Sequence, residues 1–188
     1  MRAKKKVLLL GPAHPYRGGI ADTQNYLAQN ISRLGHEVLV FTFKYQYPKL
    51  LFPGKTQYSS IPAPKGINIK RKVHSINPLN WIKTSNEINQ YDPDIVLFRY
   101  WTPFLAPCWN WISKRLSSKI KKIAVVDNWI PHERKPWDYI MNDLFGKRMD
   151  AFITLSKAVS DEIEVDRPNT HIWSGFHPIG EDLPHIIS

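Results

Sequence analysis

Short apolar runs alternate with longer amphipathic stretches along most of the chain. Continuous apolar runs of this length are typical of strands that are covered on both faces of a parallel sheet. We therefore predict seven strands, at Lys6–Leu10, Glu37–Phe43, Ile67–Val73, Asp94–Arg99, Ile120–Val126, Ala151–Leu155 and Thr170–Trp173.

Helical patterns fill several of the intervals between these strands. Apolar residues at 20, 27, 31 and 34 share one helix face, and Gly35 follows as a typical C-terminal stop. Asn77 and Pro78 are suited to be the N-cap and first residue of a helix that runs to about Tyr91. Three more helices are predicted: one starting near Ala106, one containing Trp137, Met141, Leu144 and Phe145, and a shorter one capped by Ser156.

Strands that alternate with helices predict an α/β fold with a doubly wound, mainly parallel sheet of about seven strands and helices on both faces. Residues 44–66 interrupt the rhythm, since they hold four prolines and show no clear period. A loop of this length is usually functional or flexible, and a packed irregular excursion is an equal alternative.

Ligands of open α/β sheets bind beyond the carboxyl ends of the strands, which directs attention to loops 11–19, 99–106 and 127–136. In the first loop, Gly18 and Gly19 precede a helix, whose N-terminus favours phosphate or carboxylate. Arg17 and His14 are further candidate donors. The spacing is neither G-x-G-x-x-G nor G-x-x-x-x-G-K-[ST], so a dinucleotide fingerprint and a P-loop are both disfavoured. A plain turn remains the alternative.

The other two loops carry different chemistry. The third loop holds Asp127, Asn128, His132 and Glu133, and it lacks the second histidine of an H-E-x-x-H zinc site. A surface histidine and an ordinary strand-end aspartate are the alternatives there. The second loop, Arg99–Phe104, is aromatic, and its residues, Tyr100 among them, either form a wall of an acceptor cleft or pack in the core.

Composition limits the remaining possibilities. The chain has 188 residues, a single cysteine and a net charge of +10. One cysteine excludes an internal disulfide, and no apolar run approaches the length of a membrane span, so we expect a cytoplasmic protein.

The positive charge is concentrated in the first two thirds of the chain. Residues 1–122 hold 20 Lys and Arg against 5 Asp and Glu, a net charge of +15. Such a surface attracts phosphates, anionic lipid headgroups or nucleic acid, and charge alone does not choose among them.

Several segments together resemble the amino-terminal domain of glycosyltransferase family 4, enzymes of the GT-B fold. The resemblance lies in GPAHPYRGGIADTQNYLAQNISRLGHEVLVFTF at 11–43, DPDIVLFRY at 92–100, IAVVDNWIPHE at 123–133 and DAFITLSKAV at 150–159. It implies a Rossmann-like, acceptor-side domain over residues 1–176 and the start of an interdomain hinge at 177–188. We expect the chain to lack the donor-binding carboxyl-terminal domain, with its paired glutamates, that the family carries.

The resemblance also implies a function. Such enzymes transfer a sugar from a nucleotide sugar to a glycan or lipid-linked acceptor with retention of configuration, as in polysaccharide biosynthesis, usually without an obligatory metal. It places Gly18 and Gly19 against donor phosphates and acceptor, and His132 beside the transferred sugar. Asp127, Asn128, Glu133, Arg17, His14 and Tyr100 are then candidate substrate-binding residues.

We accordingly expect no cofactor besides the donor substrate, no metal site, and no activity of this chain alone. Lys70–Lys72 and Lys119–Lys122 suggest peripheral contact with the inner face of a membrane, with ordinary solvated lysines as the alternative. A non-catalytic basic domain that binds nucleic acid or an anionic surface is the rival interpretation, although no nucleic-acid-binding motif supports it. A dehydrogenase-like dinucleotide binder and a regulatory sugar-binding protein are further alternatives.

Overall fold

The structure, a computed structural model, describes residues 3–47, 58–60, 62–131 and 135–175. The predicted hinge at 177–188 and much of the loop at 44–66 lie outside the described residues. The strands are β1 (Lys6–Leu10), β2 (Glu37–Tyr45), β3 (Asn68–His74), β4 (Ile95–Tyr100), β5 (Lys121–Val126), β6 (Ala151–Thr154) and β7 (Ile172–Ser174). The helices are α1 (Gly19–Arg33), α2 (Pro78–Tyr91), α3 (Ala106–Arg115), α4 (Asp138–Gly146), α5 (Lys157–Asp166) and the 3-10 turn η2 (Pro103–Leu105).

The strands form one parallel sheet in the order β3-β2-β1-β4-β5-β6-β7. The chain therefore moves outward from β1 through β2 to β3, returns to β4, and moves the other way to β7. The order reverses between β1 and β4, which is the switch point where open sheets of this kind bind ligands. The prediction of a doubly wound sheet with seven strands is confirmed.

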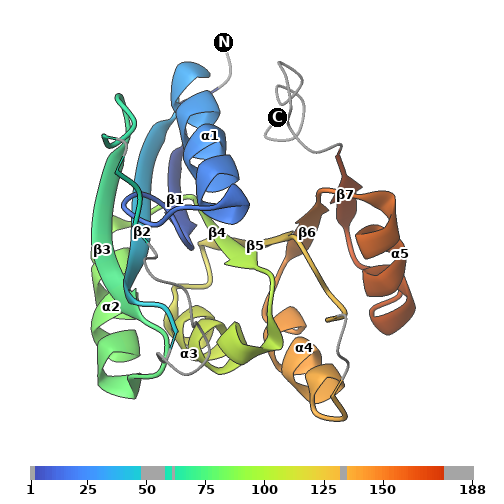
Figure 1. The fold of residues 1–188 in the computed structure, drawn as a ribbon. Helices are drawn as coiled ribbons and strands as arrows, with labels where there is room; N and C mark the ends of the chain where they lie inside the picture. The colour runs from blue at the N-terminus through green and yellow to red at the C-terminus, as the bar shows by residue number, and fades with distance from the viewer. Residues whose placement is uncertain (1–2, 48–57, 61, 132–134, 176–188) are drawn as a thin grey trace.

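Helices cover both faces of the sheet (Figure 1). On one face, Ala28 and Ile31 of α1 pack against Val7 and Leu9 of β1. On the other face, α2, α3, α4 and α5 pack against the side chains that point the opposite way, such as Leu8. Because successive strand residues point to opposite faces, the uninterrupted run at Val7–Leu10 is buried on both sides.

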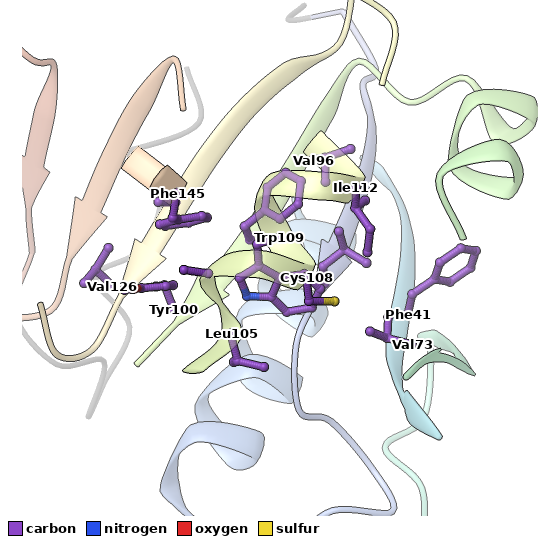
Figure 2. Packing of buried hydrophobic residues seen from close by; sticks show 14 of the residues in the cluster. Phe41, Val73, Val96, Tyr100, Leu105, Cys108, Trp109, Ile112, Val126 and Phe145 are labelled. Carbon is purple, nitrogen blue, oxygen red and sulfur yellow. The ribbon is translucent and has the colours of Figure 1, made fainter. Parts of the chain in front are cut away.

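Trp109 of α3 lies at the centre of the larger core (Figure 2). Its indole N–H donates to the backbone oxygen of Arg99 at 3.0 Å, so the ring is buried without leaving a polar atom unsatisfied. Phe43 and Phe98 contact its ring with centroid distances of 5.7 and 5.8 Å. These contacts hold α3 on the ends of β2 and β4, and they fix the loops that leave those strands.

Two helix starts follow the sequence closely. The Asn77 side chain accepts hydrogen bonds from the N–H groups of Leu79 and Asn80, at 3.0 and 3.2 Å, and Pro78 is the first residue of α2. Ser156 caps α5 by accepting from the N–H of Val159 at 3.4 Å. Both capping predictions are confirmed.

Candidate functional site

Two neighbouring pockets lie at the carboxyl edge of the sheet, beside the switch point. The first has a volume of about 550 Å³ and is formed mainly by the loop after β1, the first turn of α1 and residues that follow β2 and β4. The second has a volume of about 810 Å³ and extends toward α2 and α4. Tyr47 lines both pockets and separates them together with Trp101.

The first pocket contains the predicted glycine loop. Gly18 and Gly19 are exposed, and Gly18 is the N-cap residue of α1, with a φ of 110° that L side chains rarely adopt. Among the described residues no side chain caps this helix, so its first N–H groups are available to an anion. Arg17 is exposed at the same rim and adds a full positive charge.

Contacts with β2 and α1 hold the glycine loop in place. The N–H of Ala13 donates to Thr42 Oγ1 at 2.9 Å, and the N–H of His14 donates to Asn25 Oδ1 at 3.3 Å. Gly11 passes so close to the next strand that a Cβ there would lie 2.6 Å from Arg99 Cβ. The loop therefore presents its glycines from a fixed base, as a preorganised anion site requires.

The described part of the long loop at 44–66 also packs on the glycine loop. Tyr16 and Tyr58 form an isolated antiparallel bridge, and the N–H of Ser59 donates to the backbone oxygen of Pro15 at 2.7 Å. The Arg71 guanidinium lies 6.0 and 5.2 Å from the rings of Tyr16 and Tyr58 and donates to the Tyr58 hydroxyl at 2.9 Å. Burial, together with the neighbouring Tyr58, raises the pKa of Tyr16 to about 12.

A buried ion pair lies beneath the loop. Arg99 donates from Nε and Nη2 to the two carboxylate oxygens of Asp127, at 2.6 and 2.5 Å, and Nη2 also donates to Thr23 Oγ1 at 2.9 Å. The Arg99 side chain is 2% exposed and that of Asp127 is 14% exposed. This pair joins the ends of β4 and β5 to the first turn of α1, so it positions the helix that carries the glycines.

The second pocket is lined largely by aromatic and aliphatic side chains. Phe104 packs on Tyr47 with a centroid distance of 5.7 Å, and the Trp101 indole N–H donates to the Tyr47 hydroxyl at 2.5 Å. Trp137 is 56% exposed at the rim, with Lys135 Nζ located 5.6 Å from its ring. The remaining lining residues are Ser75, Ile76, Trp81, Thr102, Pro103, Pro107, Pro131, Asp138 and Met141.

The structure brings part of the predicted site together. Arg17, Gly18 and Gly19 share one pocket, whereas His14 is half-buried and does not line either pocket. Asn128 is exposed directly after β5, at the same edge of the sheet. His132 and Glu133 lie outside the described residues, so their roles stay predictions.

Two predicted ligand residues have structural roles. Tyr100 is fully buried, stacks on Phe145 with a centroid distance of 4.2 Å, and donates to Asn142 Oδ1 at 2.7 Å. Its placement in a cleft wall is therefore wrong, and the core alternative holds. Asp127 uses both carboxylate oxygens to accept from Arg99, so its binding to a substrate stays a prediction beside this observed role.

Several pocket and support residues were missed. Trp101, from the aromatic loop that was interpreted as a possible cleft wall, lines the first pocket together with Tyr47. Tyr47 and the supporting Arg99 were not named as site residues. A signal for Arg99 was present, because an arginine within a buried apolar strand requires a partner of opposite charge. Tyr47 had no comparable signal, since an aromatic residue after a strand is equally common in cores.

Comparisons with known proteins agree with this architecture. The model of the family described as Glycosyltransferase Family 4 matches residues 17–174. A comparison with curated protein sequences gave no significant match.

Three solved structures represent the structural matches. An alpha-glucosyltransferase in complex with UDP and a 13-mer DNA is 11% identical with a TM-score of 0.59, over 91% of this chain and 40% of that chain. Anabaena HepE in complex with UDP is 13% identical with a TM-score of 0.59, over 91% and 43%. Sucrose-phosphate synthase from Thermosynechococcus elongatus is 12% identical with a TM-score of 0.52, over 94% and 91%.

At these identities the matches show the fold alone, and they confirm the predicted Rossmann-like domain of the GT-B class. The chain spans about two fifths of the length of the first two structures.

Proposed function

The chain belongs to glycosyltransferase family 4, and from this membership we propose that it is the acceptor-binding, amino-terminal domain of a retaining glycosyltransferase. The complete enzyme would transfer a hexosyl unit from a nucleotide sugar to a glycan or lipid-linked acceptor. The chain would contribute the acceptor site and the surface that meets the diphosphate of the donor.

The observation that carries this proposal is the first pocket. It combines the exposed Gly18-Gly19 turn, the uncapped N-terminus of α1 and the Arg17 side chain at one rim. Negative charge develops on the diphosphate as the sugar departs, and fixed N–H groups and a cation at this place would stabilise it. The UDP in the alpha-glucosyltransferase and HepE structures supports a nucleotide sugar as the donor class.

This mechanism uses no obligatory metal, because the N–H groups and Arg17 would supply the positive charge. His132 follows the strand β5 in the sequence, and we propose that it donates a hydrogen bond to the transferred sugar. The main donor contacts would come from a second domain, since the alpha-glucosyltransferase and HepE are more than twice as long as the matched region. The 188 residues alone should then not catalyse the sugar transfer.

A titration of UDP-glucose into the isolated chain, followed by amide chemical shifts, tests the site. We expect weak, millimolar binding that shifts the N–H signals of Gly18 and Gly19, because only one side of the donor site is present. Arg17→Ala should weaken this binding further, while Arg148→Ala, which lies between α4 and the amino end of β6, should not. Micromolar affinity, or shifts confined to other loops, would contradict the proposal.

A product assay on the enzyme that includes the donor-binding domain tests the role of His132. His132→Ala should lower kcat by about two orders of magnitude or more, as is typical for the loss of a group that acts on the reacting centre. Near-normal turnover by this variant would remove His132 from the active site.

A basic, non-catalytic binding domain remains the second candidate because of the net charge of +10. The alpha-glucosyltransferase was solved with DNA, which makes an anionic acceptor a relevant probe. In the structure, however, Arg71 contacts Tyr58, and Lys72 pairs with Glu87 at 2.7 Å, so the run at 70–72 is largely engaged. A gel shift with duplex DNA at low and moderate salt would separate the candidates, since phosphate binding falls steeply with salt.

Peripheral contact with an anionic membrane is the remaining part of the proposal. Lys119 and Lys121 are exposed at the amino end of β5, away from the pockets. None of the described helices has the length and apolar character needed to cross a bilayer. Co-sedimentation with vesicles rich in phosphatidylserine, compared between the chain and a Lys119→Glu, Lys121→Glu variant, would test this contact.

A further inference from the structure

The second pocket has the size of a ligand site. Its volume of about 810 Å³ lies within the range of small-molecule sites, roughly 300–1,000 Å³. It lies between the 3-10 turn η2 and the first turns of α2 and α4, beside the first pocket. The proposed diphosphate contacts do not use it, and nothing in the glycine loop lines it.

The walls of this pocket combine aromatic faces with a few polar groups. Phe104 and Tyr47 form one side, and the exposed Trp137 stands at the rim. Thr102 lines the pocket and is half-buried, whereas the Ser75 hydroxyl is buried within the wall and has no hydrogen-bond partner among the described residues. Asp138 is 6% exposed, and one of its oxygens accepts from the N–H of Lys135 at 2.8 Å.

We propose that this pocket is a saccharide subsite, which binds a pyranose ring of the acceptor next to the ring that receives the new sugar. A pyranose has an apolar face of C–H groups, which packs on aromatic rings, and a rim of hydroxyls, which pairs with serine, threonine and carboxylate oxygens. The inference rests on the proposed function, because it assigns the acceptor of that same reaction.

The alternative occupant, an alkyl or isoprenoid chain, fits the aromatic walls but not the polar groups. An apolar chain would cover the Thr102 hydroxyl and the Asp138 carboxylate, which line the pocket, without supplying a hydrogen-bond partner to either. A hydroxyl-bearing ring supplies partners for both groups. The polar groups of the wall therefore favour a sugar.

The position of the pocket gives the acceptor a minimum length. Tyr47 lines both pockets, and Thr102 of the second pocket follows Trp101 of the first. A ligand that fills both must cross the edge formed by Tyr47 and Trp101. The acceptor should therefore carry at least one sugar ring beyond the ring that reacts, which predicts chain extension rather than the first glycosylation of a lipid.

Saturation-transfer NMR on the isolated chain tests this assignment. The probes are maltotriose, cellotriose, chitotriose and mannotriose, together with dodecyl maltoside below its critical micelle concentration. We expect saturation of pyranose protons in at least one trisaccharide and of the sugar head of the dodecyl maltoside. Trp137→Ala should weaken the binding about fivefold, the loss of one aromatic contact. Trp173→Ala, which removes an exposed tryptophan on β7, should leave it unchanged.

Three results would overturn the saccharide subsite: no trisaccharide is saturated, saturation falls on the dodecyl chain alone, or Trp137→Ala and Phe104→Ala bind as the unchanged chain does. Circular dichroism of each variant would show that it is folded. The saturation-transfer experiment contains no nucleotide, so its outcome does not depend on whether UDP-glucose binds to the first pocket. Loss of sugar binding with retained shifts at Gly18 and Gly19 would reject this subsite alone.

Discussion

Removing the charge of Asp127 should destabilise the fold strongly, because Arg99 would remain buried without a counter-charge. Asp127→Asn keeps the shape of the side chain and changes only this property. At N–O distances of 2.5 and 2.6 Å, and with an effective dielectric constant of about 20, the attraction is roughly 6 kcal/mol. Desolvation offsets part of it, and breaking one partner of a buried pair typically costs about 3–5 kcal/mol.

Urea denaturation followed by tryptophan fluorescence would measure this cost. The midpoint should fall with an unchanged slope, and the melting temperature should fall by roughly 6–20 °C for a domain of this size. Asp161→Asn is the matched control, because Lys157 and Asp161 form a similarly short pair of 2.7 Å with both side chains largely exposed. That variant should unfold as the unchanged chain does.

A double-mutant cycle distinguishes the loss of the ion pair from a general intolerance of substitution at these two positions. In the double variant Arg99→Met, Asp127→Asn, no unpaired charge remains, so the loss should be smaller than the sum of the two single losses by about 2 kcal/mol or more. Equal stabilities of Asp127→Asn and Asp161→Asn, or strictly additive losses in the cycle, would refute the reasoning.

The remaining predictions concern the glycine loop and its surroundings. Gly11→Ala should destabilise far more than Gly35→Ala, since both have positive φ but only Gly11 faces a Cβ at 2.6 Å, that of Arg99; equal urea midpoints would contradict this. Because the folded pKa of Tyr16 is about 12 against an ordinary value of 10, the unfolded chain releases that proton first. Stability should therefore fall between pH 10 and about 12, and Tyr16→Phe should show a smaller fall over that window. Burial raises the pKa of the Cys108 thiol, so a disulfide reagent should label it only as fast as the chain unfolds, and rapid labelling of folded protein would place it at the surface.

The architecture was predictable because each of its elements has a local signal. The continuous run at Val7–Leu10 indicated a strand buried on both faces, and the side chains are indeed buried on both. Asn77 and Ser156 were recognisable as caps from residue type and position alone. The observed strand ends differ from the predicted ends by a residue or two. β2, for example, continues to Tyr45 because it pairs with β3 beyond the apolar run. Pairing between strands is not encoded in the local pattern.

The site was only partly predictable, because the topological rule selects loops but does not orient side chains. Alternation along β4 decides the orientation: Val96, Phe98 and Tyr100 share the face that packs on α3 and α4, whereas Leu97 and Arg99 point toward α1. Applied one residue at a time, period-two alternation assigns Tyr100 to the core, as the structure does. It also assigns Arg99 to the opposite face, under the glycine loop, where Asp127 at the end of the neighbouring strand β5 pairs with it. This contact depends on the strand order β1-β4-β5. Predicting the ion pair that supports the anion site therefore required the sheet topology in addition to the local pattern.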